Sequence, residues 1–103
     1  MNNFINNKFS LHNRIILITG GAGFLGSRIT MNIRKCNGFP IIIDNNQKSI
    51  NSLKKEYFET FNEKLIYFKG DLSNPKKIKT LFKKKIDPIY RVDSLVNCAS
   101  TDT

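Results

Sequence analysis

A glycine-rich segment at residues 19–26 carries the strongest chemical signal in the sequence. Read from Gly21, it has the spacing G-x-G-x-x-G, and it stands between an apolar stretch and a run with helical periodicity. In such a setting the first glycine permits a tight turn, Gly23 lets the backbone approach a pyrophosphate, and Gly26 lets a helix pack closely on a strand. No lysine follows in the G-K-[ST] form of a P-loop. The segment therefore predicts a dinucleotide site.

Backbone amides at the start of the following helix would complete this site. Around Phe24 and Leu25 the N–H groups have no acceptor within the helix, and the helix dipole lies behind them. Both effects favour an anion such as a pyrophosphate at this end of the helix. The alternative explanation of the segment is a glycine-rich connector without a ligand.

An aspartate stands where a dinucleotide site needs one. Asp44 ends the second apolar stretch, about 20 residues after the glycines, and a carboxylate there can accept hydrogen bonds from the 2′- and 3′-hydroxyls of the adenosine ribose. It would repel the 2′-phosphate of NADP. Because the next residues, Asn45, Asn46 and Gln47, include no arginine to compensate, the sequence predicts that NAD is preferred over NADP.

The elements that must position these residues follow from the apolar pattern. Four stretches are apolar at consecutive positions, which is typical of strands covered on both faces, and they are residues 14–19, 39–43, 65–68 and 93–98. Three helices are expected between them, and their apolar stripes are Leu25, Ile29 and Ile33; Ile50, Leu53, Tyr57, Phe58 and Phe61; and Ile78, Leu81 and Phe82. We expect Asn37 and Gly38 to end the first helix at residues 24–35, and Ser73 to cap the third, with Pro75 in its first turn.

Strands and helices in alternation predict an α/β fold, a doubly wound parallel sheet of the Rossmann type with about four strands and three helices. In that topology the first three strands step outward in one direction and the fourth returns to the far side of the first. The glycine segment then lies at the switch point, where ligands bind. Two helices would cover one face and one helix the other. The fourth strand would keep an open apolar edge at Leu95 and Val96, a site for self-association or pairing with another chain.

From residue 11 to residue 100 the sequence resembles the short-chain dehydrogenase/reductase superfamily. The segment that begins with Thr19 and Gly20 is similar to the T-G-x-x-G-x-x-G motif of the extended branch, which includes nucleotide-sugar epimerases and dehydratases. The resemblance implies that Asp71 contacts the adenine of the cofactor and that Leu72 packs against its ring.

A second motif of the superfamily is matched near the end of the chain. Residues 95–99 are similar to the N-N-A-G segment of the shorter oxidoreductase branch, with Cys98 in place of the second Asn and Ser100 in place of the Gly. The resemblance implies that Asn97 stabilises the central sheet and that the backbone of Ala99 lines the cofactor pocket. Because one motif favours the extended branch and the other the shorter one, the substrate class stays open.

The catalytic pair of the superfamily, Tyr-x-x-x-Lys, is missing from this sequence. Four residues after Tyr57, Tyr67 and Tyr90 stand Phe61, Asp71 and Ser94. We therefore expect a polar leader at residues 1–13 and a cofactor-binding half-domain at 14–103 that stops before the catalytic region. Such a unit could belong to an NAD-dependent oxidoreductase, to an epimerase or dehydratase, or to a non-enzymatic NAD-sensing or partner-binding module.

Charge and composition exclude several other classes. The 103 residues include 17 Lys and Arg against 8 Asp and Glu, which gives a net charge of +9. Six lysines of the third helix are expected to form its solvated face rather than a nucleic-acid site, and they are Lys76, Lys77, Lys79, Lys83, Lys84 and Lys85. Two distant cysteines and one histidine cannot build a metal site. No stretch is apolar enough for a signal peptide or a membrane span, so we expect a cytoplasmic chain with reduced thiols.

Overall fold

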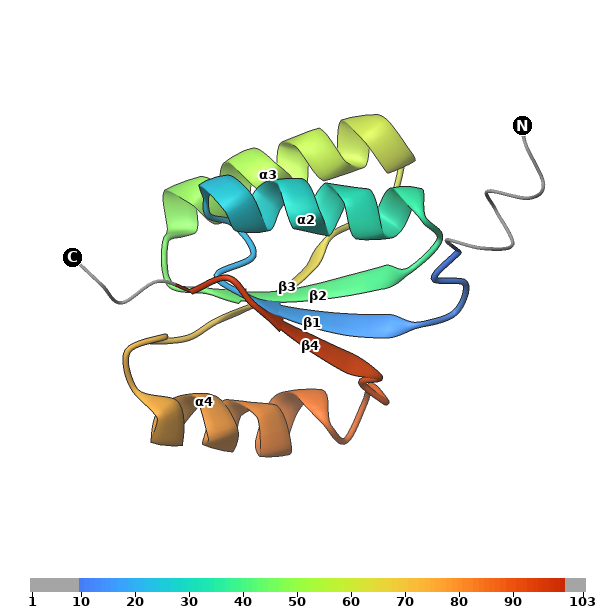
Figure 1. Cartoon of the computed structure of the whole chain (residues 1–103). Helices are drawn as coiled ribbons and strands as arrows, with labels where there is room; N and C mark the ends of the chain where they lie inside the picture. Colours follow the sequence, from blue (N-terminus) through green and yellow to red (C-terminus); the bar gives the residue numbers. More distant parts are fainter. Residues whose placement is uncertain (1–9, 100–103) are drawn as a thin grey trace.

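The computed structural model describes residues 10–99, which form one parallel β-sheet with helices on both faces (Figure 1). The strands are β1 (Ile15–Thr19), β2 (Phe39–Asp44), β3 (Ile66–Lys69) and β4 (Ser94–Asn97). The helices are α2 (Phe24–Lys35), α3 (Gln47–Phe61) and α4 (Pro75–Leu81), and a π-helical turn, η1 (Phe82–Ile86), continues α4. These elements confirm the predicted α/β fold. Most of the expected polar leader lies outside the described residues.

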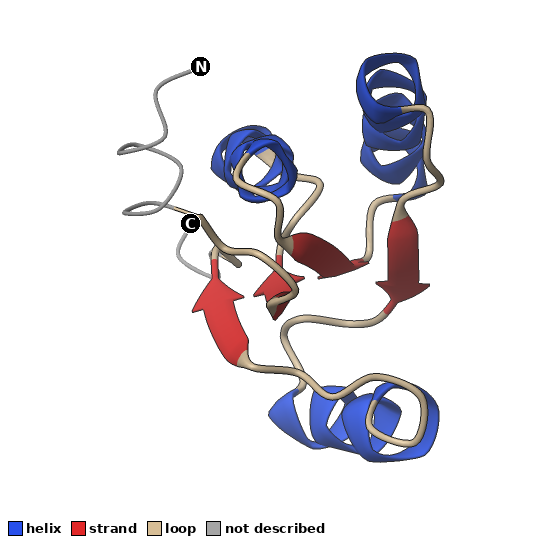
Figure 2. Ribbon diagram, turned by 90° about the vertical axis from the view of Figure 1, so that its right-hand side faces the viewer, coloured by secondary structure: helices blue, strands red, loops and turns tan. Residues whose placement is uncertain are grey.

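The order of the strands places the glycine segment at the centre of the sheet. The order is β3-β2-β1-β4, and β1 pairs in parallel with both β2 and β4. Helices α2 and α3 cover one face and α4 the other, as predicted (Figure 2). The segment after Thr19 therefore emerges at the switch point, where the strands on its two sides connect through opposite faces of the sheet.

Strands β1 and β2 are buried on both faces, which explains their continuous apolar runs, whereas β3 is half-buried and three of the four residues of β4 are exposed. On the α2 and α3 side, Ile18 and Ile42 pack with residues such as Leu53 in one cluster. On the α4 side, Leu17 and Ile41 belong to a second cluster, which also includes residues of β3, α4 and η1. Because alternate residues of one strand serve different clusters, no position in the centre of the sheet is available for a polar side chain.

Two residues of the predicted apolar stripes are exposed, and those expectations were wrong. Leu25 is 62% exposed because it lies in the first turn of α2, beside the glycine segment. Phe58 is 52% exposed, whereas its neighbour Tyr57 is 3% exposed. A stripe that includes both Tyr57 and Phe58 is wider than the contact of α3 with the sheet, so only Tyr57 reaches the core.

The caps of two helices show one agreement and one difference. At the end of α2, Asn37 has a φ of +71° and the amide of Gly38 donates to the Ile33 carbonyl at 2.9 Å, as the predicted stop requires. At the start of α4 the cap is Asn74, whose side-chain oxygen accepts a hydrogen bond from the Lys77 amide at 3.2 Å. The prediction of Ser73 was wrong, because that side chain bonds Asp71 instead.

Burial of Tyr57 predicts a loss of stability at alkaline pH. Removal from water, reinforced by the negative charge of Glu63, raises the pKa of Tyr57 to about 12. The phenol of the unfolded chain ionises near pH 10. Its contribution to stability is therefore complete below pH 10 and is lost as the pH rises towards 12, by about 2 kcal/mol. Urea unfolding across this range measures the loss. The Tyr57→Phe variant should show a shallower decrease, and equal slopes for the two proteins would contradict the prediction.

Candidate functional site

The chain turns at Gly20, directly after β1. Its φ is +71°, in the left-handed region, and a Cβ there would lie 2.7 Å from the backbone nitrogen of Ala99. The sequence interpretation assigned this turn to Gly21, which was wrong because Gly20 is the glycine with a positive φ among the described residues. Gly21 is needed for another reason, since its Cβ would lie 2.5 Å from a side-chain carbon of Ile42.

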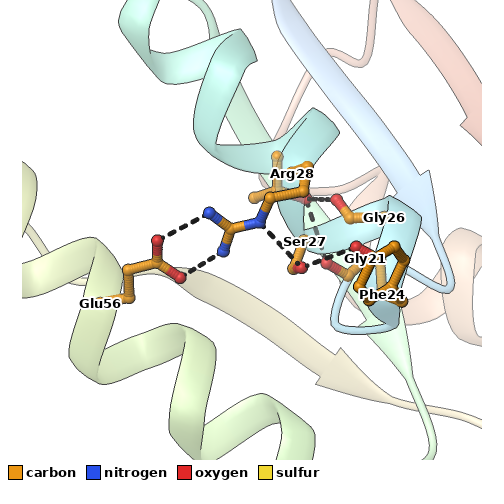
Figure 3. A network of polar contacts seen from close by, with 7 residues as sticks. Gly21, Phe24, Gly26, Ser27, Arg28 and Glu56 are labelled. Carbon is orange, nitrogen blue, oxygen red and sulfur yellow. Dashed lines mark hydrogen bonds and ion pairs between the residues drawn. The ribbon is translucent and has the colours of Figure 1, made fainter.

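Close packing of α2 on the turn depends on Gly26. A Cβ there would lie 2.0 Å from the carbonyl oxygen of Gly20, so no other residue fits, in agreement with the predicted role of this glycine. The fully buried hydroxyl of Thr30 lies 2.8 Å from the Gly26 carbonyl oxygen and 3.2 Å from that of Gly21, and it can donate to either (Figure 3). Helix and turn are thus held together by direct contact and by a hydrogen bond.

The open part of the segment is Gly23, the N-cap of α2. Its φ of −71° suits any residue, and a Cβ would meet nothing closer than the Gly20 carbonyl at 3.4 Å. The fold therefore does not require glycine here. The first bonded amide of the helix is that of Ser27, and no acceptor among residues 10–99 reaches the amides of Phe24 and Leu25. An anion can approach these amides closely because Gly23 has no side chain.

An exposed ion pair joins the N-terminal part of α2 to α3. The guanidinium of Arg28 makes a two-pronged contact with the carboxylate of Glu56, and its Nη1 lies 2.9 Å from Oε2 (Figure 3). Hydrogen bonding to this guanidinium lowers the pKa of Glu56. In the same turn the hydroxyl of Ser27 donates to the Phe24 carbonyl at 3.1 Å. Beside the pair lies a hollow of about 380 Å³, and the Phe24 side chain on its rim is 96% exposed.

Asp44 lies below the glycine segment and holds it in place. The carboxylate is 8% exposed, and it accepts hydrogen bonds from the Ala22 amide (Oδ2, 3.0 Å) and from the Asn46 amide (Oδ1, 3.0 Å). Each carboxylate oxygen can accept a second hydrogen bond. Asp44 is therefore at the carboxyl edge of the sheet, as predicted, and it has a structural role that the sequence did not indicate.

The carboxyl ends of β1 and β4 are joined by two side chains. The hydroxyl of Thr19 donates to Oδ1 of Asn97 at 2.7 Å, and the Ala99 amide donates to the same oxygen at 3.2 Å. Asn97 thus links the central strand β1 to the edge strand β4. Ser100, named with it, lies outside the described residues.

Asp71 and Leu72 follow β3 on the same edge of the sheet. One oxygen of the Asp71 carboxylate accepts from the amide (3.0 Å) and the hydroxyl (2.6 Å) of Ser73. These hydrogen bonds lower the pKa of Asp71. The Asp71 side chain is exposed, and its other carboxylate oxygen accepts no hydrogen bond from residues 10–99. Leu72 is half-buried against the α4 cluster.

The sequence that forms this site is matched by the model of a known family. The family model described as short chain dehydrogenase covers residues 14–103. The chain belongs to the short-chain dehydrogenase family. The resemblance in the sequence is therefore confirmed, and so is the Rossmann-like fold.

Individual relatives of this short-chain dehydrogenase family member share its fold at low identity. 2-Keto-3-deoxy-D-gluconate dehydrogenase from Streptococcus agalactiae superposes with a TM-score of 0.79, at 21% identity over 98% of this chain and 38% of that one. A short-chain dehydrogenase from Shigella flexneri complexed with NADP gives 0.77, at 23% identity over 88% and 39%. The post-translational flagellin modification protein A of Campylobacter coli is 24% identical over 84% of this chain and 34% of its own length. The chain thus spans well under half of each relative.

Several of the predicted site residues of this short-chain dehydrogenase family member lie together in one groove. A groove of about 670 Å³ opens between β4 and α4, and its upper end is formed by Thr19, Leu72, Asn97 and Ala99. Gly23 and Phe24 line the smaller hollow between α2 and α3 instead. The predicted residues therefore occupy the carboxyl edge of the sheet but divide between two depressions.

Three residues that support the site, Thr30, Arg28 and Glu56, were not predicted from the sequence. Thr30 carries a recognisable signal, because a threonine four residues after Gly26 in a helix can bond the carbonyl one turn back. The Arg28 and Glu56 pair joins two helices far apart in the sequence, and no local pattern reveals it.

Neither a metal centre nor a membrane span was found in the described part of the chain. No group of three or more His, Cys, Asp or Glu side chains could hold a metal ion there. No helix between residues 10 and 99 is both long and apolar enough to cross a bilayer.

Proposed function

We propose that this chain binds the dinucleotide cofactor of a short-chain oxidoreductase and that it prefers NAD to NADP. The observation that carries the proposal is the open N-terminus of α2, where the Phe24 and Leu25 amides have no acceptor among residues 10–99 and Gly23 leaves room in front of them. A pyrophosphate placed there would accept both hydrogen bonds and would benefit from the helix dipole. When bound, the cofactor supplies hydride transfer.

Asp44 supports the preference for NAD. Its oxygens keep one free acceptor position each, which suits the two hydroxyls of a ribose. A 2′-phosphate would bring a second negative charge next to this carboxylate. Two basic side chains line the hollow beside α3: Arg28, which is paired with Glu56, and Lys48, which stands four residues beyond Asp44. The Shigella flexneri relative carries NADP, so the two cofactors must be compared directly.

The remaining assignments are an adenine contact for Asp71 and Leu72 and a lining role for Asn97 and Ala99. Leu72, Asn97 and Ala99 meet at one end of the larger groove, which supports their grouping. We assign no proton-transfer step to this sequence, because it contains no Tyr-x-x-x-Lys pair. A cytoplasmic location and reduced cysteines remain predictions.

A nucleotide-sugar epimerase or dehydratase is the second candidate. Phe24 favours it, because the glycine spacing around that residue is the spacing of the extended branch. Those enzymes retain NAD through the reaction cycle. A chain of that class should therefore copurify with NAD, which the absorbance and mass of the released nucleotide would reveal.

Isothermal titration calorimetry with NAD and NADP tests the proposal. We expect binding of NAD and at least about tenfold weaker binding of NADP, a difference of about 1.4 kcal/mol. The Gly23→Val variant should fold normally and lose binding, since the Cβ position is open but faces the amides. Circular dichroism verifies the fold of each sample. Equal or tighter binding of NADP would refute the preference, and folded protein that binds neither nucleotide would refute the function.

A further inference from the structure

The hollow between α2 and α3 adjoins the ribose end of the proposed cofactor site. Ala22 and Gly23 line the hollow, and the Ala22 amide is the group that donates to the Asp44 carboxylate at 3.0 Å. A phosphate carried by a ribose at Asp44 would therefore lie next to this hollow. The charged side chains that line it are Arg28, Lys48 and Glu56.

The best phosphate donor among these side chains is already occupied. A guanidinium presents two parallel N–H groups that fit the oxygens of a phosphate as well as those of a carboxylate. In Arg28 both Nη1 and Nη2 donate to the Glu56 carboxylate, and Nε lies 3.5 Å from the hydroxyl oxygen of Ser27 (Figure 3). The paired donors of Arg28 are thus directed at α3.

Glu56 also limits the positive charge of the hollow. Its carboxylate compensates Arg28, which leaves Lys48 as the one lining cation outside the ion pairs found within residues 10–99. Lys48 is exposed in the first turn of α3, and its ammonium acts as a point charge without the paired donors of a guanidinium. The Asp44 carboxylate beside the hollow opposes this single charge.

We propose that Glu56 is a positioning residue that withholds Arg28 from a 2′-phosphate and thereby favours NAD over NADP. This inference rests on the proposed function and adds a second determinant to Asp44. Without Glu56, both terminal nitrogens of Arg28 would be free, and the hollow would carry two uncompensated cations. The two side chains of the pair are 54% and 41% exposed, so a released guanidinium has room to turn towards a ligand. Exposed pairs contribute little to stability, so the variant protein should remain folded.

Isothermal titration calorimetry of the Glu56→Gln variant with NAD and NADP tests this inference. We expect the ratio of the NADP to the NAD dissociation constant to fall by about fivefold relative to the unsubstituted chain, because the 2′-phosphate gains a charge-assisted contact at an exposed position. Glu56→Ala should change the ratio in the same direction. The matched control is Glu59→Gln, which removes the same charge from an exposed position of α3 that joins no ion pair within residues 10–99. It should leave the ratio unchanged.

Two further measurements assign the effect to Arg28. In the double variant Arg28→Ala with Glu56→Gln the gain in NADP binding should be lost. In nuclear magnetic resonance spectra, the Nε–H signal of Arg28 should move more with NADP than with NAD in Glu56→Gln. In the unsubstituted chain the two nucleotides should move it equally.

Four outcomes would overturn the inference. The first is an equal change of the ratio in Glu59→Gln, which would indicate a general effect of charge. The second is a gain that persists in the double variant, and the third is an equal loss of NAD and NADP in Glu56→Gln, which would indicate a structural role alone. The fourth is normal NAD binding with an unchanged ratio, which would leave the proposed function intact. Folded, unsubstituted protein that binds neither nucleotide would refute the function and this inference together.

Discussion

Replacing Gly26 by alanine is expected to lower the free energy of unfolding by more than about 4 kcal/mol, or to prevent folding. The added Cβ would lie 2.0 Å from the Gly20 carbonyl oxygen and 2.9 Å from the Cα of Gly21. Both neighbours are backbone atoms of the turn, so no rotamer change can relieve the contact. Helix α2 would have to move away from β1, and this would disrupt the hydrogen bond of the Thr30 hydroxyl and part of the core.

Urea denaturation followed by circular dichroism measures this effect. The matched control is Gly23→Ala, a glycine of the same segment whose Cβ would meet only the Gly20 carbonyl, at an ordinary distance of 3.4 Å. We expect this control to lose no more than about 1 kcal/mol, because alanine is a poorer N-cap than glycine. Similar unfolding midpoints for the two variants would show that the packing of α2 on the turn is less strict than the structure indicates.

Replacing Asp44 by alanine is expected to lower stability by about 3 kcal/mol and to weaken NAD binding by at least about tenfold. The stability effect arises because the buried Ala22 amide loses its acceptor and the turn at Asn46 loses a second hydrogen bond. The binding effect arises because the ribose hydroxyls lose theirs. A loss of binding in this variant alone therefore cannot be assigned to the ribose contact.

Two further variants separate these effects. Asp44→Asn keeps a side-chain oxygen, so it should cost less stability than alanine, and removal of the negative charge should raise the affinity for NADP relative to NAD. Asp71→Ala removes an exposed carboxylate that bonds only Ser73 among residues 10–99, and we expect a change in stability below about 1 kcal/mol. If the Asp44→Ala variant were as stable as the Asp71→Ala variant, this would refute the claim that Asp44 holds the glycine segment in place.

The sequence pattern was sufficient for the fold because the strands are buried on both faces. Ile16 to Ile18 and Ile41 to Ile43 leave no polar position, which is typical of a parallel sheet covered on both faces. The strand order followed from the doubly wound topology, in which the first three strands step outward and the fourth returns beside the first. The exact turn residue did not follow, because Gly20 and Gly21 are adjacent and the spacing rule does not report which of them has a positive φ.

Features formed by distant residues could not be predicted in this way. The Asp44 contact with Ala22 depends on how far the turn folds back over β2, and the groove depends on the distance between α4 and β4. The π-helical turn η1 also lacks a local signal, as its residues, Phe82–Ile86, read as a continuation of α4. Exposure of Leu25 and Phe58 shows the same limit, because periodicity gives a face and not the width of its contact.

Pairing of β1 with β4 has a consequence for the order of events during synthesis. β1 is made first but lies at the centre of the sheet, and its bond to Asn97 spans 78 residues. Until β4 leaves the ribosome, one edge of β1 has no neighbour, and Gly20 has no Ala99 to pack against. Closing so long a loop is slow, so the edge of β1 that faces β4 stays unpaired until residues 94–97 have been made and have docked. We therefore expect the glycine turn to be among the last parts to form.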